Sequence, residues 1–364
     1  MRLQNLEQLY QRTRDAKKIV VVDLGVLGDT LQLVPALWEL KQHYPAAALH
    51  VLSSPLGSEA LRLAPCVEHV WPLHISRATR TWREHWHVIR TLRREQYSLA
   101  FNFIGNDRGT ILTGLTGASC RVAHAAGRQH FWNRWLVPNW VPRQDKEQAV
   151  FEQHRQVLAA CGLNLGPVRF DLSVGPKEQA LAAKLVPAGA IHLSINSGNP
   201  FKECPVEFNA QLLKALWVTH PSLQVVASAG PKPRERERLQ ELASLVSDPR
   251  LIPLTQGLSI TELAAVLARC RLHLGPDSGA MHLASALNTP TVSFFREQGD
   301  FKCWLPRGPT HRALSVPCKC IDHQNAPCER LGYADCLAQI SPTQAQTLVS
   351  ELLVRALSVQ NHAR

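Results

Sequence analysis

The segment that decides the fold is LHLGPDSGAMHLASALNTPTVSFF, residues 272–295. A first apolar run stops at GPDSG, residues 275–279, and the spacing afterwards predicts a helix and then a second strand. Asp277 or Ser278 would cap this helix, whose first amides would face an anion with the positive end of the helix dipole behind them. The turn suits a pyrophosphate, and His282 would stand one turn along on the same face. A capped helix with a buried histidine is the alternative.

A second turn of this kind opens the chain. The β-branched run IVVVDL, residues 19–24, fits a buried parallel strand, and GVLGDT, residues 25–30, leads from it into an apolar helical pattern over residues 31–40. Asp29 followed by Gln32 is a capping-box pattern. The other interpretation of Asp29 is a general base, because open α/β sheets bind ligands beyond the carboxyl ends of their strands.

Alternating strand and helix patterns predict two doubly wound α/β domains. The length of 364 residues and the 45% hydrophobic content fit two globular domains. The predicted domains are residues 1–165 and 188–340, joined by a Gly- and Pro-rich linker at 166–187 and followed by a last helix within 341–364. The expected strands are residues 19–24, 48–52, 69–72, 99–103, 190–195, 224–229, 250–253, 272–274 and 291–295.

Nothing in the sequence predicts a membrane span or a secretory signal. No stretch reaches the ~18 uninterrupted apolar residues of a transmembrane helix, and residues 1–18 carry charges throughout. We therefore expect a cytoplasmic protein. Leu3, Leu6, Leu9 and Tyr10 have the spacing of a short amphipathic helix, which we expect to dock on the body, with a membrane surface as the alternative.

Further segments resemble glycosyltransferase family 9, the ADP-heptose:lipopolysaccharide heptosyltransferases. Residues 25–45 are similar to the opening of that family, and the GPDSGAMHLASALNTPTV segment is similar to its donor-site signature. Other matches follow in family order, at residues 103–124, 194–216, 257–279 and 336–353. The likeness covers about residues 19–355. It implies an α/β GT-B fold, with two Rossmann-like domains facing a central cleft and the last helix bracing the N-terminal acceptor domain.

The resemblance also implies roles for matching positions. Asp29 would be the base that deprotonates the acceptor hydroxyl, and Lys202 would place a positive charge on the leaving ADP, whose negative charge needs stabilisation in the transition state. No cofactor would be required for catalysis. The implied donor residues are Ser197, Lys202, Glu235, Leu258, Asp277, Ser278, Gly279 and His282, and the implied acceptor residues are Thr30, Asn106 and Arg108.

Two positions depart from the family pattern. Asp23 lies on the first strand where the family often has a basic residue, so the acceptor of this chain carries its charge elsewhere or differs. After the strand at 291–295 the sequence REQGD, residues 296–300, replaces the usual glycine and acidic turn. The transferred sugar is therefore less firmly predicted than the nucleotide diphosphate.

A basic segment of the sequence suggests what kind of acceptor the protein binds. The chain carries 40 Lys and Arg against 29 Asp and Glu, a net charge of +11, and residues 77–94 are its densest basic stretch. Trp82, Trp86 and Ile89 are predicted to face the core, which leaves arginines outward: Arg80, Arg83, Arg90 and Arg94. This helix is either a solvated face or a surface for lipopolysaccharide phosphates or an anionic bilayer. Nucleic acid is disfavoured because no nucleic-acid motif is present.

Ten cysteines form a scattered set and a cluster. Cys66, Cys120, Cys161, Cys204 and Cys270 are expected to be free thiols in a reducing compartment. Five others lie between residues 303 and 336, and four of these thiolates suit a structural Zn or Fe ion: Cys318, Cys320, Cys328 and Cys336. His323 could replace one ligand, and free thiols or a labile disulfide are the alternatives.

These observations predict an inverting glycosyltransferase that moves a heptose from ADP-heptose to a lipid A-core oligosaccharide at the membrane surface. A protein O-heptosyltransferase with a cysteine-bound metal is the alternative within the class. A noncatalytic basic scaffold at a membrane or nucleic acid is the alternative outside it. The turn at residues 25–30 lacks the G-x-G-x-x-G order of a dinucleotide site, so a dehydrogenase or epimerase is disfavoured. The oligomeric state is not predicted.

Overall fold

The computed structural model describes residues 4–74, 82–125, 130, 132–142, 147–318 and 334–362, without the side chains of residues 4–5, 82–85 and 356–362. It divides into two compact units, Met1–Ser173 and Val174–Arg364. The boundary lies inside the predicted linker. Helix α9 (Pro176–Leu185), which also falls in that linker range, packs on the second unit against α12 (Ile260–Arg269).

The first unit is built on a six-stranded sheet in the order β3-β2-β1-β4-β5-β6, and every described pairing is parallel. Strand β1 is central because its β-branched side chains are buried on both faces, as parallel sheets require. The strands are β1 (Lys18–Asp23), β2 (Ala48–Ser53), β3 (His69–Pro72), β4 (Leu99–Asn102), β5 (Cys120–His124) and β6 (Asn139–Val141).

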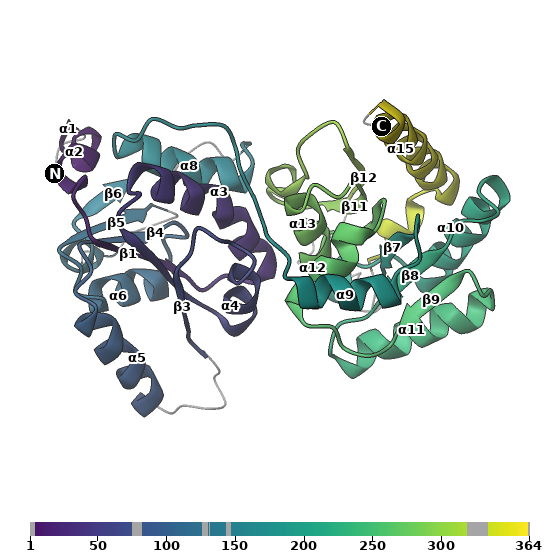
Figure 1. Ribbon diagram of the computed structural model, residues 1–364, viewed down its shortest axis with the longest axis horizontal. Helices are drawn as coiled ribbons and strands as arrows, with labels where there is room; N and C mark the ends of the chain where they lie inside the picture. Colours follow the sequence, from purple (N-terminus) through teal and green to yellow (C-terminus); the bar gives the residue numbers. More distant parts are fainter. Residues whose placement is uncertain are drawn as a thin grey trace. The chain divides into compact units, whose positions relative to one another are not determined.

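Helices cover both faces of this sheet. Figure 1 shows α3 (Leu27–His43) and α8 (Val150–Ala160) on one face and α5 (Trp82–Arg94) and α6 (Asp107–Leu115) on the other. Two separate apolar clusters lie under these layers, one on each side of the sheet. Shorter helices complete the unit: α1 (Gln4–Glu7), α2 (Leu9–Thr13), α4 (Pro55–Leu61) and α7 (Asn133–Leu136).

The second unit repeats the plan with a sheet in the order β12-β11-β10-β7-β8-β9, again parallel in each described pairing. Its strands are β7 (Ile191–Ser194), β8 (Val225–Ser228), β9 (Leu251–Leu254), β10 (His273–Pro276), β11 (Thr291–Glu297) and β12 (His311–Pro317). Numbered from its own first strand, each unit has the order 3-2-1-4-5-6 of a Rossmann fold.

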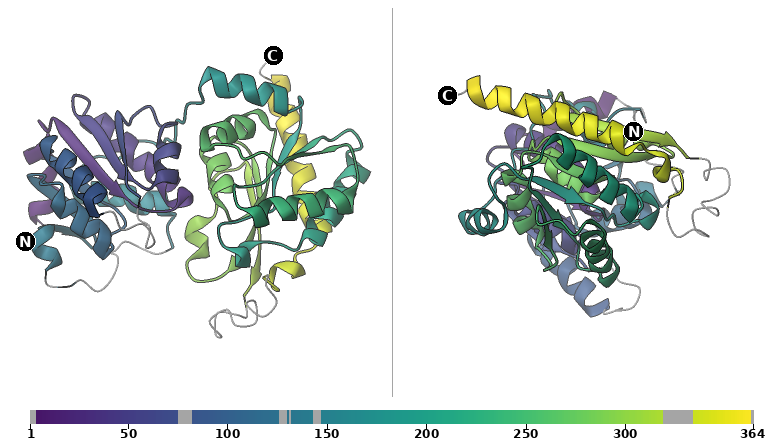
Figure 2. Two further views of the ribbon diagram at one scale, coloured as in Figure 1. Left: turned by 90° about the horizontal axis from the view of Figure 1, so that it is seen from below. Right: turned by 90° about the vertical axis from the view of Figure 1, so that its right-hand side faces the viewer.

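Two helical layers enclose the second sheet. Helices α9, α12 and α13 (Gly279–Ala286) lie on one side, and α10 (Val206–Thr219), α11 (Pro233–Val246) and α15 (Pro342–His362) lie on the other. Figure 2 shows α15, in yellow, lying against this unit, where it packs beside α10. That α15 braces the first unit stays a prediction. The described part of this unit also contains short 3₁₀ helices: η1 (Pro200–Lys202), η2 (Phe301–Trp304) and η4 (Leu337–Gln339).

The prediction that the N-terminal segment docks on the body is confirmed for the residues described. Leu6 and Leu9 are buried in the apolar cluster of the first unit, and the Tyr10 hydroxyl donates to the carbonyl of His43 at 3.3 Å. Leu3 lies outside the described residues. Within the described ranges, no helix is long and apolar enough to cross a membrane.

The prediction for α5 is wrong at Trp86. Its side chain is 51% exposed, whereas Ile89 and Leu92 are buried. The reason is that the described side chains of this helix that pack on the body, Val88, Ile89 and Leu92, lie on another side of the helix, beginning two residues after Trp86. Arg90 and Arg94 are exposed as expected, while Arg80 and the side chains of Trp82 and Arg83 lie outside what the structure describes.

Candidate active site

Three neighbouring strands of the second sheet bring the predicted donor residues to one edge. Strands β10, β7 and β8 are adjacent and parallel, so their carboxyl ends lie together. The segment after β10 carries Asp277 to His282, and the segment after β7 carries Ser197 to Lys202. Glu235 begins the helix that follows β8. The gap between β7 and β10 is the point where the strand order reverses, which is where open α/β sheets bind ligands.

Asp277 contacts two other candidate donor residues at this edge, Lys202 and His282. Its Oδ2 accepts a hydrogen bond from Lys202 Nζ at 2.6 Å, and its Oδ1 lies 3.5 Å from His282 Nε2. Burial opposes ionisation of Asp277, but the His282 hydrogen bond and the Lys202 charge outweigh it, so its pKa lies below the ordinary value. A carboxylate, an ammonium group and an imidazole are thus held together, with the Lys202 side chain 40% exposed.

Helix α13 begins beside this cluster. Ser278 is its N-cap, and the Ser278 hydroxyl accepts a hydrogen bond from the amide of Met281 at 3.4 Å. Gly279 is the first helical residue, so its amide belongs to the unpaired first turn of the helix. The His282 ring packs edge-on against Trp304 with centroids 5.6 Å apart. Of the two predicted caps, Ser278 is the one that acts, which leaves the Asp277 carboxylate for Lys202 and His282.

Ser197 is fixed from two sides. Its hydroxyl donates to the carbonyl of Asp277 at 2.9 Å, and its amide donates to Glu203 at 2.7 Å. Glu203 is buried and also accepts a bidentate pair of 2.7 Å hydrogen bonds from Arg234. Sequence reasoning missed this role of Glu203, because only the fold brings the start of α11 beside it.

The other two predicted donor positions lie further along the edge. Glu235 is buried at the start of α11, and its carboxylate lies where a Gly230 side chain would be, 2.1 Å from an added Cβ. Glycine at position 230 is therefore needed to admit that carboxylate. Leu258 is partly buried in the turn before α12 and packs against an apolar cluster.

Asp29 lies at the corresponding edge of the first sheet, after β1. Its carboxylate accepts a hydrogen bond from the amide of Val26 at 2.9 Å. The predicted capping pair of Asp29 and Gln32 is wrong, because α3 begins at Leu27, earlier than expected, and Val26 is its N-cap. Asp29 is thus the third helical residue, partly exposed and beside the unpaired amides of the first turn.

Two buried groups support this turn. Asp23, at the end of β1, accepts a 2.5 Å hydrogen bond from the Thr30 hydroxyl and a 3.2 Å hydrogen bond from the amide of Gly25. Thr30 is fully buried. Burial raises the pKa of Asp23 to about 6, with hydrogen bonds from Thr30 and Gly25 opposing it. The sequence marks Asp23 as an acidic residue within an apolar strand, at a position where the family often has a basic residue, but does not reveal its contact with Thr30.

The remaining acceptor candidates follow β4. Asn106 is the N-cap of α6 and accepts a 2.7 Å hydrogen bond from the amide of Gly109. Arg108 lines a hollow of about 350 Å³ between α5 and α6. Its other lining residues are apolar: Leu52, Leu73, Val88, Ile89, Leu92, Ile111 and Leu112.

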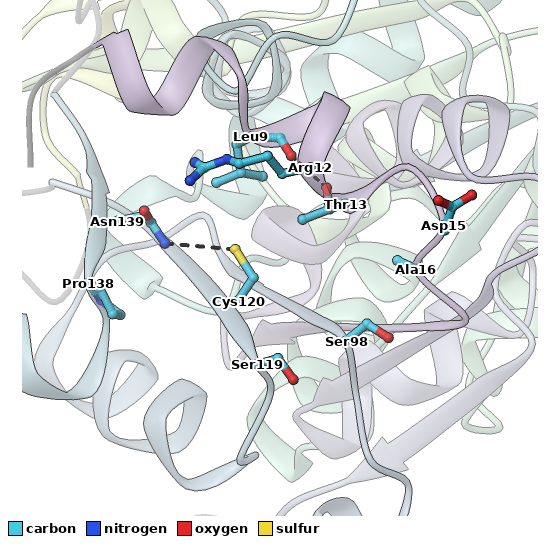
Figure 3. Close-up of a pocket in the computed structure, with 10 residues that line it drawn as sticks. All are labelled: Leu9, Arg12, Thr13, Asp15, Ala16, Ser98, Ser119, Cys120, Pro138 and Asn139. Atoms are coloured by element: carbon cyan, nitrogen blue, oxygen red, sulfur yellow. Dashed lines mark hydrogen bonds between the residues drawn. The ribbon is translucent and has the colours of Figure 1, made fainter.

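A larger hollow, of about 540 Å³, lies at the opposite edge of the first sheet (Figure 3). Ala16, Ser98, Ser119 and Pro138 line it from positions just before or at the amino ends of their strands. Figure 3 also shows the contact between Asn139 and Cys120, which are 3.8 Å apart. Since ligands bind beyond the carboxyl ends in such sheets, this hollow is separate from the candidate site.

The predicted metal ligands are only partly described. Cys318 and Cys336 are buried in one apolar cluster of the second unit, whereas Cys320, Cys328 and His323 lie outside the described residues. Among the residues that the structure describes, no group of three or more metal-ligating side chains comes together. The scattered cysteines Cys66, Cys120, Cys161, Cys204 and Cys270 are free thiols, and burial raises the pKa of Cys66, Cys161 and Cys270 to about 12.

Comparison with known proteins identifies the class. The family model for glycosyltransferase family 9 (heptosyltransferase) matches residues 85–334, and the chain belongs to this family. It is therefore a glycosyltransferase. Lipopolysaccharide heptosyltransferase 3 of Escherichia coli is 25% identical over 289 residues, which cover 77% of this chain and 83% of that protein.

Solved structures share the fold. The family 9 glycosyltransferase of Veillonella parvula superposes with a TM-score of 0.79 at 19% identity, covering 93% of this chain and 98% of that one. The E. coli heptosyltransferase WaaC, solved with ADP, gives a TM-score of 0.74 at 18% identity, covering 92% and 99%. The predicted α/β fold with two Rossmann-like domains is confirmed.

Proposed function

We propose that the chain is an inverting heptosyltransferase that transfers a heptose from ADP-heptose to a lipopolysaccharide core acceptor. The observation that carries the proposal is the Lys202–Asp277–His282 cluster beside the first turn of α13, in a chain of the heptosyltransferase family. Two similar proteins support the donor and the acceptor: WaaC is a heptosyltransferase solved with ADP, and the E. coli relative is a lipopolysaccharide heptosyltransferase.

The residues at the donor site are proposed to stabilise negative charge on the diphosphate. The amides of Ser278 and Gly279 and the dipole of α13 face the diphosphate, and Lys202 exchanges its contact with Asp277 for a phosphate oxygen. These groups stabilise the negative charge that develops on the departing ADP, so catalysis is proposed to need no cofactor. Ser197 adds a hydroxyl near the phosphates. Glu235 and Leu258 are proposed to contact the ribose and the adenine.

The acceptor end is proposed to work by proton removal. Asp29 takes the proton of the attacking hydroxyl as the new glycosidic bond forms and the bond to ADP breaks with inversion. Thr30 positions this helical turn through Asp23. Asn106 and Arg108 bind the acceptor, with Arg108 pairing with an anionic group on it. We propose a cytoplasmic enzyme that works at the inner-membrane surface.

Replacement of Asp29 tests this function. Asp29→Asn keeps the shape of the side chain and removes its basicity, so transfer from ADP-heptose to a heptose-free core oligosaccharide should fall by about 10²-fold or more. ADP affinity should be unchanged, because the donor site belongs to the other unit. Asp15→Asn, at an exposed aspartate in the first unit, is the control. Full transfer by Asp29→Asn would contradict the proposal.

The second candidate is a protein O-heptosyltransferase with a cysteine-bound structural metal. The observation in its favour is the set Cys318, Cys320, Cys328 and Cys336 within 19 residues of sequence. Metal analysis of the purified protein separates the candidates when combined with the acceptor assay. About one Zn or Fe per chain, with transfer to serine-containing protein and none to core oligosaccharide, would favour this second candidate.

A further inference from the structure

Asp23 is a buried carboxyl group directly beneath the turn that carries Asp29. Only 3% of the residue is exposed. One carboxylate oxygen accepts from Thr30, the residue after Asp29, at 2.5 Å, and the other accepts from the amide of Gly25 at 3.2 Å. The two hydrogen bonds reach both sides of the turn between β1 and α3. Asp23 therefore determines where the first turn of α3 lies relative to the strand.

The turn between β1 and α3 is also tightly packed, so its backbone has little room to move. A Cβ added at Gly25 would lie 2.4 Å from the Cβ of Asp29, far inside normal contact distance. The carbonyl of Gly25 also accepts a 3.0 Å hydrogen bond from the Ser54 hydroxyl. Two hydrogen bonds thus hold the backbone of Gly25. Its amide donates to Asp23, and its carbonyl accepts from Ser54, the residue that follows β2. Asp29 stands on a turn fixed at several points.

Gly57, in the neighbouring helix α4, also helps to fix the position of Asp23 and Thr30. A Cβ added at Gly57 in α4 would lie 2.2 Å from the Ser53 hydroxyl and 2.7 Å from the Thr30 hydroxyl. Glycine there lets α4 approach both hydroxyl groups around Asp23. Because α4 packs so closely here, a displacement of Asp23 or Thr30 would clash with the backbone of α4 and would also disturb α3.

The electrostatics of Asp23 argue against a purely structural role. Burial is the largest influence on its pKa and raises it, hydrogen bonds from Thr30, Gly25 and Ser53 lower it, and the negative charge of Asp29 raises it. The net pKa is about 6, so the group is mostly ionised at neutral pH at a cost in stability. Asp29 is the charged neighbour that affects the pKa of Asp23, and the hydroxyl groups of Thr30 in α3 and Ser53 in β2 also face the Asp23 carboxyl group.

We propose that Asp23 is a positioning residue for glycosyl transfer, which holds the Asp29 turn through Thr30 and Gly25 and strengthens Asp29 as a base by its negative charge. Repulsion between two carboxylates is mutual, so each disfavours ionisation of the other. While Asp23 is ionised, above about pH 6, its charge makes Asp29 a stronger base than Asp29 would be beside a neutral group at the same position. The inference rests on the proposed function of Asp29.

The test compares wild type with Asp23→Asn, which keeps the size of the side chain and removes its charge. The kcat for transfer from ADP-heptose should fall by roughly ten- to a hundredfold, with the KM for ADP-heptose unchanged. The acid limb of the pH–rate profile should move to lower pH. The Tm at pH 7.5 should stay equal or rise, because a buried charge is lost. An unmoved acid limb, or a loss of kcat that follows a fall in Tm, would overturn the proposal.

Thr30→Val separates the two parts of the effect. This variant keeps the charge of Asp23 and removes its link to α3, so kcat should fall while the acid limb does not move to lower pH. An unchanged kcat would show that the Thr30 contact does not position Asp29, and would overturn that part of the proposal.

Carboxyl NMR gives a readout that needs no substrate. In protein with ¹³C-carboxyl-labelled aspartate, one resonance should titrate near pH 6 and be missing in Asp23→Asn. The resonance assigned to Asp29 through Asp29→Asn should also respond near pH 6 in wild type, where Asp23 takes up its proton, and this response should be missing in Asp23→Asn. Identical Asp29 titrations in both proteins would overturn the proposal. Absence of transfer by the wild-type protein would instead refute the proposed function. The NMR titration would then still test whether the charge of Asp23 acts on Asp29.

Discussion

Lys202 and Asp277 are 75 positions apart in sequence, yet their side-chain atoms are 2.6 Å apart. They meet because the strands before them, β7 and β10, are neighbours in one parallel sheet. The sequence predicts Lys202, Asp277 and His282 individually, but the hydrogen-bond cluster that they form depends on that pairing. Glu203 shows the limit of such reasoning, since its partner Ser197 comes from the segment after β7 and its partner Arg234 from helix α11.

A buried histidine pair makes the second unit sensitive to acid. His192 and His273 lie side by side on β7 and β10 with their Nδ1 atoms 2.9 Å apart. Burial lowers the pKa of His192 to about 3 and that of His273 well below 6.5. The unfolded chain therefore binds more protons than the folded one below pH 6.5, so stability is full above that pH and falls as the pH drops.

We expect the loss to approach about 1.4 kcal/mol per pH unit for each histidine between pH 6.5 and the folded pKa. Hydrogen exchange of the β7 and β10 amides, corrected for the intrinsic effect of pH, should show lower protection at pH 5 than at pH 7.5. Equal protection at the two pH values would mean that the pair does not remain neutral on acidification.

At the scale of elements, strands with continuous apolar runs are predicted well, whereas several short strands or strands of mixed polar and apolar sequence are missed. All nine predicted strands are present, whereas β5, β6 and β12 are absent from the prediction. The sequence of β6 is only NWV between two prolines, and β12 alternates polar and apolar residues with none buried. Such segments become strands because a neighbouring strand offers unpaired backbone groups, a tertiary effect that local patterns do not contain.

The helix α5 combines exposed arginines with an exposed tryptophan, an arrangement typical of interfacial helices. If the enzyme works at a membrane surface, Trp86→Ala should weaken binding to vesicles that contain anionic lipid, by roughly threefold to tenfold. Trp135→Ala, at an even more exposed tryptophan on α7, is the matched control. Co-sedimentation with anionic and with neutral vesicles measures the effect. Equal binding of Trp86→Ala and wild type would contradict a membrane role for α5.

At the scale of the molecule, two units with the same strand order carry different chemistry at equivalent places. The reversal point lies between β1 and β4 in the first unit and between β7 and β10 in the second. Asp29 follows β1, and Asp277 follows β10. The repeated α/β pattern predicts this organisation, since strand order follows from short right-handed connections. The sequence does not reveal that the Asp277 carboxylate is paired with Lys202, because that contact depends on the fold.

The proposed donor site is tested most directly by calorimetric titration of the whole chain with ADP and ADP-heptose, beside UDP- and GDP-linked controls. We expect selective binding of the adenine nucleotides, weakened about tenfold or more in Lys202→Ala because a charged hydrogen bond to phosphate is lost. Lys214→Ala, at an exposed lysine on α10, should bind as wild type does. Equal affinity of Lys202→Ala and wild type, or no preference for ADP, would contradict the donor site proposed at Lys202 and Asp277.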